Sequence, residues 1–189
     1  LLHVEHENAP LGENIATLKE KLNRISKAIA VLPDIRNQAI SDNKEDCLID
    51  EIAGLLDEKE TLVEKLQILR RDIETWKEWG NFNPDLIEDL KSKQIWVRLC
   101  KVSVQEIKAI PEGAVLEMIF RKGNIVYCAV ISRKEIELPF ETLALPEMGM
   151  EEMLFEEKKY EKRLVEIENR FLELAAYKNA LHNYENYLN

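Results

Sequence analysis

Residues 48–76 read LIDEIAGLLDEKETLVEKLQILRRDIETW. Apolar side chains recur in this stretch at alternating steps of four and three residues, which is the spacing of a coiled-coil seam. A lysine within the seam covers apolar surface with its stem and keeps its ammonium group in solvent. The spacing predicts a long paired helix that ends at Gly80. The seam positions are Leu48, Ile52, Leu55, Lys59, Leu62, Leu66, Leu69, Ile73 and Trp76.

Two further segments carry heptad spacing. The first has the seam Leu11, Ile15, Leu18, Leu22, Ile25, Ile29 and Leu32, and it is expected to end at Pro33 because proline cannot donate to the helix ladder. The second is expected to run as one helix from near Met148 to the end of the chain. Its seam is Met153, Tyr160, Ile167, Leu174, Leu181 and Leu188, interleaved with Glu157, Leu164, Phe171, Lys178 and Glu185.

The pairing of these three helices follows from their lengths. We expect the third helix to pair with the second in the opposite direction, since a single helix with so narrow an apolar stripe is unstable in water. We expect the first helix to pack alongside. The linker of residues 33–44 is long enough for that helix to run parallel or antiparallel to the second.

Residues 80–146 have a different pattern, typical of a small α/β lobe. The run 125–131 is almost continuously apolar, which predicts a central strand covered on both faces. Gly123 supplies the positive φ that a tight hairpin before this strand needs. The other expected elements are a short helix over 85–90 with Asn83 as N-cap and Pro84 first, strands over 95–99 and 115–121, and helical turns after the capping boxes Ser103/Glu106 and Ser132/Glu135.

Charge differs between the two kinds of segment. The chain has 26 Lys and Arg residues against 36 Asp and Glu residues, a formal net charge of −10. Residues 80–146 hold nine of each sign, so the whole surplus belongs to the helices. An acidic chain has no general attraction for nucleic acid or an anionic membrane surface. No apolar run is long enough to span a bilayer, so we expect no membrane contact from this segment.

Chemistry-bearing residues are few, and the sequence predicts no catalytic, cofactor-binding or metal-binding residue. His3 and His6, with Glu5 and Glu7, do not form a metal site in our interpretation, because His6 faces away from the other three in an extended segment. His182 is expected to be exposed. No glycine-rich phosphate loop and no nucleophile elbow is present. Partner-binding residues stay unassigned.

The remaining residues of note are interpreted as structural. Cys47, Cys100 and Cys128 have no paired spacing, which favours a reducing cytoplasm over a disulfide scaffold. The cysteines at 100 and 128 are expected to be small core residues. The aromatic side chains Trp76, Trp79 and Phe82 are expected to pack the junction between helix and lobe. The carboxylates Glu151, Glu152, Glu156 and Glu157 are interpreted as a solvated face and not as an acid/base pair.

The order of four motifs resembles a known family. The motifs are LLHVE at 1–5, WGNFNP at 79–84, IWVRL at 95–99 and VYCAVIS at 126–132. In this order, between long heptad segments, they are similar to the cytoplasmic N-terminal half of subunit I of V-type (A-type) rotary ATP synthases, the relative of vacuolar ATPase subunit a. The resemblance covers essentially all of the chain.

The resemblance implies an α+β fold in which a long antiparallel helical coiled coil is capped by a small α/β lobe. Residues 1–79 would hold the first and second coiled-coil helices, with 1–8 as the end of a proximal strand. Residues 80–146 would form the distal lobe and 147–189 the returning helix. The opening Leu-Leu-His lacks a methionine, and we expect the chain to be a piece of a longer or processed protein.

The resemblance also implies a function. The chain would be a non-catalytic, cofactor-free stator segment at the cytoplasmic face of the membrane. It would link the membrane sector to the peripheral stalks and resist rotor torque. Its partners would be peripheral-stalk subunits and other rotary ATPase subunits. The family's ion-translocating membrane half would be absent from this chain.

Two other classes of protein stay open on the sequence. A cytosolic coiled-coil adaptor or chromosome-organising protein also places an α/β lobe between two helical arms, and such a lobe acts as a hinge or dimeriser. An enzyme with its site on the lobe is the third class, and it has no recognisable motif in its favour.

Overall fold

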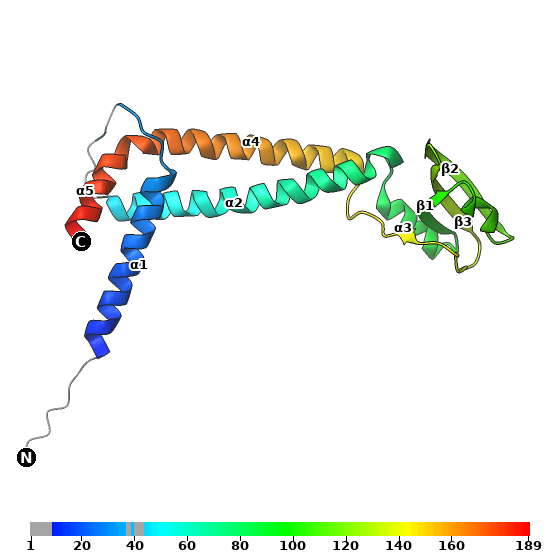
Figure 1. The fold of residues 1–189 in the computed structure, drawn as a ribbon, viewed down its shortest axis with the longest axis horizontal. Coiled ribbons are helices and arrows are strands. Elements are labelled where there is room, and N and C mark those ends of the chain that lie inside the picture. Colours follow the sequence, from blue (N-terminus) through cyan, green and yellow to red (C-terminus); the bar gives the residue numbers. More distant parts are fainter. Residues whose placement is uncertain (1–8, 37–38, 40–43) are drawn as a thin grey trace, which may run out of the picture. The chain divides into compact units, whose positions relative to one another are not determined.

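The computed structural model describes the backbone of residues 9–36, 39 and 44–189, and the side chains of 15–36, 39 and 44–189. The chain divides into two compact units, unit 1 (Leu1–Lys65 with Tyr160–Asn189) and unit 2 (Leu66–Lys159). The proposed proximal strand at 1–8 lies outside the described residues. The fold is α+β, as predicted. Figure 1 labels the elements that are named below.

The long helices lie toward the two ends of the chain, and the strands and the short helix α3 lie in the middle. The helices are α1 (Ala9–Val31), α2 (Glu45–Trp76), α3 (Pro84–Ser92), α4 (Met150–Leu174) and α5 (Lys178–Leu188), with 3-10 turns at Lys77–Trp79, Glu106–Ala109 and Ala175–Tyr177. The strands are β1 (Trp96–Ser103), β2 (Ala114–Lys122), β3 (Ile125–Ser132) and β4 (Thr142–Leu143).

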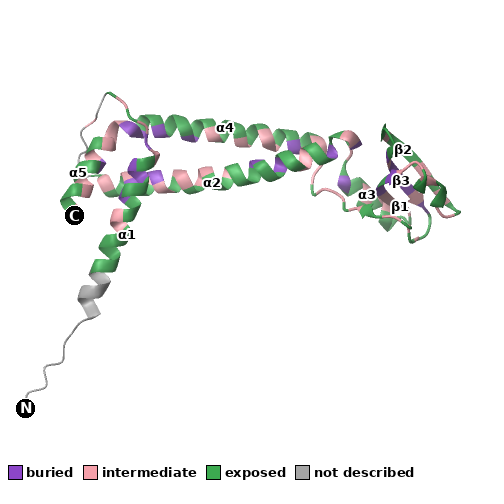
Figure 2. Cartoon of the chain, viewed as in Figure 1, coloured by how far each residue is buried: buried purple, intermediate pink, exposed green. Residues whose placement is uncertain are grey.

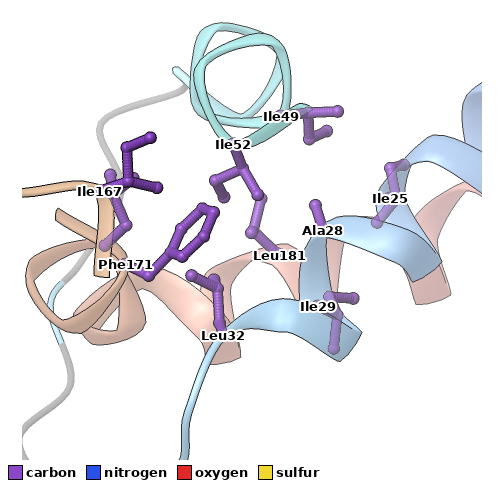
Figure 3. Close-up of a cluster of buried hydrophobic side chains, with 10 residues drawn as sticks. Ile25, Ala28, Ile29, Leu32, Ile49, Ile52, Ile167, Phe171 and Leu181 are labelled. Carbon is purple, nitrogen blue, oxygen red and sulfur yellow. The ribbon is translucent and has the colours of Figure 1, made fainter. Parts of the chain in front are cut away.

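Unit 1 has an apolar core built largely from the predicted seams, to which Ala28 and Ile49 add side chains from outside them. Side chains from α1, α2, α4 and α5 converge there, as Figure 3 shows, and each contributes at least one fully buried aliphatic residue. Burial of such side chains stabilises a fold by about 1.5–3 kcal/mol each. The core residues are Ile25, Ala28, Ile29, Leu32, Ile49, Ile52, Ile167, Phe171, Leu174 and Leu181.

The position of α1 differs from the prediction. It crosses α2 and does not lie alongside it (Figure 1). Its neighbour along the axis is α5, to which it runs antiparallel: Ser26 donates to Glu185, and the Lys178 ammonium donates to the Leu32 carbonyl at 2.7 Å. Lysine 178, an interleaved seam position in the sequence, therefore caps the C-terminal end of α1.

The third predicted helix is also interrupted. A 3-10 turn at Ala175–Tyr177 separates α4 from α5. Both flanking seam residues, Leu174 and Leu181, are still buried. The turn redirects the chain from α2 to α1, a change that apolar spacing alone does not encode.

Unit 2 contains a four-stranded antiparallel sheet with the strand order β2-β3-β1-β4. The interior position of β3 is confirmed, and Val126, Cys128 and Val130 are buried on one of its faces. Partly buried side chains from the surrounding loops cover this face. They are Val104, Ile107, Ile110, Ile136, Leu138 and Phe140, with Ala114 and Leu116 of β2.

Local signals in unit 2 were largely correct. The Asn83 side chain accepts from the Asp85 amide at 2.9 Å and caps α3. Gly123 has a φ of +61° in the β2–β3 turn. Ser103 and Glu106 form the predicted reciprocal capping box, with an N···O distance of 2.7 Å from the Ser103 amide to Glu106.

Two expectations for the segment after β3 were wrong or incomplete. No helical turn follows Ser132, because its hydroxyl donates to the Lys134 carbonyl at 2.7 Å instead of capping a helix. The short strand β4 pairs with β1 and was not predicted. Two residues are too few to show an alternating pattern.

Candidate interaction surfaces

The described residues hold no group of three or more His, Cys, Asp or Glu side chains placed to bind a metal ion. His3 and His6, with Glu5 and Glu7, lie outside the described residues. His182 is exposed, as predicted, and lies 3.7 Å from Glu185 one turn along α5. Among the described helices, none has the length and apolar character needed to cross a bilayer.

The aromatic side chains predicted to pack the junction do so within unit 2. The ring of Trp76 lies 5.6 Å from that of Trp79 and 5.8 Å from that of Phe82, measured between centroids. Trp79 is 4% exposed and meets Tyr127 of β3 edge-on at 5.4 Å. Such aromatic pairs contribute roughly 0.5–1.5 kcal/mol beyond area burial. They fix one face of the sheet to the end of α2.

Sequence reasoning missed two members of this junction. Tyr127 completes the aromatic cluster and also contacts the ring of Phe120 at 5.7 Å. Gly149, just before α4, approaches the backbone so closely that an added Cβ would lie 2.9 Å from the Phe82 carbonyl oxygen. Neither role is visible in the sequence, since both depend on segments that are distant in the chain.

The carboxylates at the start of α4 contact polar and cationic side chains, as expected for a solvated helix face. Glu151 accepts from the Asn81 amide at 2.7 Å. Glu157 pairs with Arg70 of α2 at 2.8 Å. Glu156 pairs with Lys159 one turn along the same helix at 2.9 Å. Glu156 and Glu157 thus pair with cations and Glu151 with a neutral amide, so each of the three has a separate partner.

Ion pairs also link α2 and α4 in unit 1. The Arg170 guanidinium contacts Glu51 at 2.7 Å, and the Arg163 guanidinium contacts Glu58 through both carboxylate oxygens at 2.7 and 2.9 Å. Between these two ion pairs, the residue number rises by seven along α4, from 163 to 170, and falls by seven along α2, from 58 to 51. The two helices therefore run antiparallel in unit 1. Arg163 holds the pKa of the Glu58 carboxyl below its ordinary value through this hydrogen bonding.

An exposed apolar surface lies on the outer strand of the sheet. We call it the β2 surface and define it as Val115, Met118 and Ile119 of β2 with Ile125 at the start of β3; their exposed fractions are 63%, 55%, 42% and 42%. The register shifts between Met118 and Phe120, which places a bulge at Ile119. Bulges discourage unspecific strand pairing at a sheet edge. Val115 and Met118 pair with Ile131 and Cys128 of β3, so their side chains lie on opposite faces of the sheet and have its exposed edge in common.

No protein-family model matches this chain, and no curated protein matches it either. Among solved structures, the chain is similar to one described as the crystal structure of the cytoplasmic N-terminal domain of subunit I, homolog of subunit a, of V-ATPase. The two are 14% identical, the match covers 91% of this chain and 72% of that chain, and the TM-score is 0.41. That domain comes from the family that the order of the sequence motifs resembles.

Proposed function

We propose that this chain is the cytosolic stator segment of the membrane subunit of an ion-translocating V-type ATPase or ATP synthase. In that role it links the membrane sector to the peripheral stalks and resists rotor torque. The observation that carries the proposal is the antiparallel, ion-paired packing of α2 on α4 in unit 1, through Arg170 with Glu51 and Arg163 with Glu58. The four sequence motifs, whose order resembles that of subunit I, support the assignment to a rotary ATPase.

The proposal requires α2 and α4 to pair along their length as an antiparallel coiled coil. A helix of 32 residues, the length of α2, spans about 50 Å. Two helices with a continuous apolar seam resist bending better than a loop-rich chain does. Torque resistance over tens of ångströms needs such an element, and the heptad seams of 48–76 and 153–188 supply the side chains for it.

The proposed contact with the stalks is the β2 surface. A neutral lobe with exposed apolar side chains at a sheet edge suits docking of another subunit better than the acidic helices do. Interface energy concentrates in a few central apolar residues. Val115 and Met118 are the most exposed members, one on each face of the edge strand β2, and the proposed contact covers this edge from both sides.

The binding test uses the full chain and purified peripheral-stalk subunits of the same complex, with affinity measured by sedimentation velocity. The double variant Val115→Asp/Met118→Asp should bind about tenfold or more weakly. The control is Val165→Asp on α4, a residue that is 57% exposed and lies in unit 1, and it should bind like the unchanged chain. Equal binding by all three proteins, or no binding at all, contradicts the stalk contact.

Sedimentation of the chain alone distinguishes the adaptor class. A stator segment is expected to be monomeric at micromolar concentration. A dimer that the Val115→Asp/Met118→Asp change dissociates would favour a hinge-type dimerising adaptor and would overturn the stator assignment. Small-angle scattering typical of a sphere would contradict the coiled coil.

A further inference from the structure

The charge of residues 80–146 is unevenly distributed, although its total is zero. Residues 101–108 and 120–127 lie where β1 ends and the β2–β3 hairpin turns, and they hold four cationic side chains and one carboxylate, that of Glu106. The other residues of 80–146 hold five cationic side chains and eight carboxylates. The hairpin end is therefore positive in a chain whose formal net charge is −10. Its cations are Lys101, Lys108, Arg121 and Lys122.

The strand register places two of these cations around an exposed isoleucine. Ile125 pairs with Lys122 of β2, and Tyr127, two residues further along β3, pairs with Lys101 of β1. Alternate residues of a strand share a face, so these four side chains lie on one face of the sheet. Figure 2 shows β2 largely exposed and β3 largely buried, and Ile125, 42% exposed, is the exposed residue of β3. We call Lys101, Lys122 and Ile125 the hairpin-end site.

The two lysines of the hairpin-end site have no carboxylate partner within the described part of the chain. Arg98, toward the other end of β1, does have one, since it pairs with Glu135 at 3.3 Å. The Lys101 ammonium lies over the ring of Tyr127, 5.4 Å from its centroid, and Lys122 is exposed. Both positive charges are therefore available to an anionic ligand.

The other charged side chains at this end have local partners. The Glu106 carboxylate accepts from the Ser103 amide at 2.7 Å in the capping box. The Arg121 guanidinium donates to the Gly123 carbonyl at 2.9 Å, which keeps it at the hairpin turn. Arg121 thus adds a third positive charge next to the hairpin-end site, and Glu106 is the one carboxylate that opposes it.

The surroundings of the site favour a protein segment over nucleic acid or a membrane. Base stacking needs an open aromatic face, but the Tyr127 ring already meets Trp79, Phe120 and the Lys101 ammonium. An anionic bilayer attracts clusters of many cations, which this acidic chain does not have. A protein segment presents carboxylates and apolar side chains together, and that combination matches two lysines on either side of an isoleucine.

We propose that the hairpin-end site binds an acidic segment of a partner protein. An apolar side chain of that segment covers Ile125, and carboxylates on either side of it pair with Lys101 and Lys122. The strands that carry the two lysines lie two strand spacings apart, about 10 Å. An exposed ion pair contributes little by itself, so the apolar contact and both ion pairs are needed together. The inference rests on the hairpin end and not on the rotary function proposed above, so the two can fail separately.

The test uses three short fluorescein-labelled peptides and the full chain. The acidic peptide has Ile at its centre and two Glu on each side, the basic peptide has Lys in place of Glu, and the third has Ser in place of Ile. Fluorescence anisotropy at low salt should show the acidic peptide binding about tenfold more tightly than the basic one, with an affinity that falls as salt rises. The net charge of −10 alone predicts the reverse order.

Each peptide comparison can contradict the proposal. Equal affinity of the acidic and basic peptides, the reverse order, or no binding of either overturns it. The Ser peptide should bind a few-fold more weakly than the acidic peptide, and equal affinity of these two overturns the apolar contact with Ile125.

Variants locate the site. Lys101→Glu/Lys122→Glu should weaken binding of the acidic peptide about tenfold or more and keep the circular dichroism of the chain, because both side chains are exposed. The control Lys93→Glu/Lys134→Glu makes the same change in net charge at two exposed positions outside the hairpin end, and it should bind like the unchanged chain. Loss of binding in both double variants, or in neither, overturns the assignment. Lys122→Glu alone leaves the Lys101 contact with Tyr127 in place and should weaken binding severalfold; unchanged binding overturns it as well.

The same variants distinguish other anionic ligands. A thymidine oligonucleotide and phosphatidylserine vesicles should both bind more weakly than the acidic peptide at equal salt. Binding of either that is as tight, and that Lys101→Glu/Lys122→Glu abolishes, overturns the assignment to a protein segment. A dimer of the chain that this double variant dissociates identifies a second copy as the occupant and overturns the assignment to a different protein.

Discussion

Cys100 on β1 and Cys128 on β3 lie directly opposite each other in the antiparallel register, and the Cys128 thiol donates to the Cys100 carbonyl at 3.6 Å. Both side chains are completely buried. Burial, with a smaller contribution from the neighbouring Cys128 thiol, raises the pKa of Cys100 to about 11, and burial raises the pKa of Cys128. Thiols in such surroundings are packing groups and poor nucleophiles.

Alkylation should therefore distinguish the three cysteines. In the native protein at pH 7 we expect iodoacetamide to modify Cys47, which is exposed, and to leave Cys100 and Cys128 unmodified until the chain unfolds. With a pKa near 11, only roughly one in ten thousand Cys100 thiols is ionised at this pH. Mass spectrometry of peptides from native and urea-unfolded protein measures the difference. Rapid native modification at all three sites would contradict the buried sheet.

Gly149 should be intolerant of a methyl group. Its Cβ would lie 2.9 Å from the Phe82 carbonyl oxygen, a backbone atom that cannot move freely, so Gly149→Ala should destabilise the protein by about 1–3 kcal/mol. Gly54→Ala is the control. It lies within α2 with nothing within 4 Å of the added carbon, and higher helix propensity should stabilise it by about 0.5–1 kcal/mol. Urea unfolding measures both, and equal effects would contradict the close approach.

The two halves of α1 should respond differently to the same substitution. Ile25→Ala removes a side chain with no exposed surface and should cost about 2–5 kcal/mol. Ile15→Ala changes a half-exposed position of the same seam and should stay within about 0.5 kcal/mol of the unchanged protein. Denaturant midpoints at constant m-value provide the comparison. A large loss in Ile15→Ala would show that the N-terminal half of the seam is covered in the isolated chain.

Much of unit 2 could be predicted because its signals are local. Asn83, Gly123 and the Ser103–Glu106 capping box each act within four residues, and the structure has all three where the sequence places them. The failure at Ser132 has a local cause too. Its hydroxyl has a competing acceptor in the Lys134 carbonyl, and serine side chains satisfy either geometry.

The sequence predicts which helical positions are apolar, but it does not predict which helices pack against one another. The heptad pattern identifies which side chains seek apolar contacts, and Ile25, Ile52 and Ile167 are buried as it predicts. It does not state which helix supplies the contact. Ile15 and Ile25 occupy equivalent positions in the pattern, yet Ile15 is half exposed and Ile25 is completely buried. The crossing of α1 over α2 depends on the same long-range geometry.

The link between Arg163 and Glu58 should make stability depend on pH in a defined direction. Because Arg163 lowers the pKa of Glu58, the contribution of this pair is present above the ordinary carboxyl pKa and is lost as the pH falls through the lowered value. Arg163→Gln should be less stable than the unchanged protein at pH 7, by a small margin that salt reduces, since the pair is partly exposed. Urea unfolding at pH 7 and pH 3 measures the margin.

Lys162→Gln is the matched control, because the Lys162 ammonium lies 4.0 Å from Glu166 and is 82% exposed. Its stability should match that of the unchanged protein at both pH values. A margin for Arg163→Gln that persists at pH 3 would show that the arginine acts through packing of its stem and not through the Glu58 carboxylate.

The turn at Ala175–Tyr177 has a consequence for how this sequence can change over evolutionary time. The Ala39 amide donates to the Ala176 carbonyl at 2.8 Å, so the turn is held by the linker that joins the first two helices. Residues before and after the turn follow the same heptad spacing, and the buried ones share one core with α1 and α2. Covariation among homologous sequences should therefore link positions on both sides of residue 176 through this core, with Leu174 and Leu181 at its two ends in the sequence.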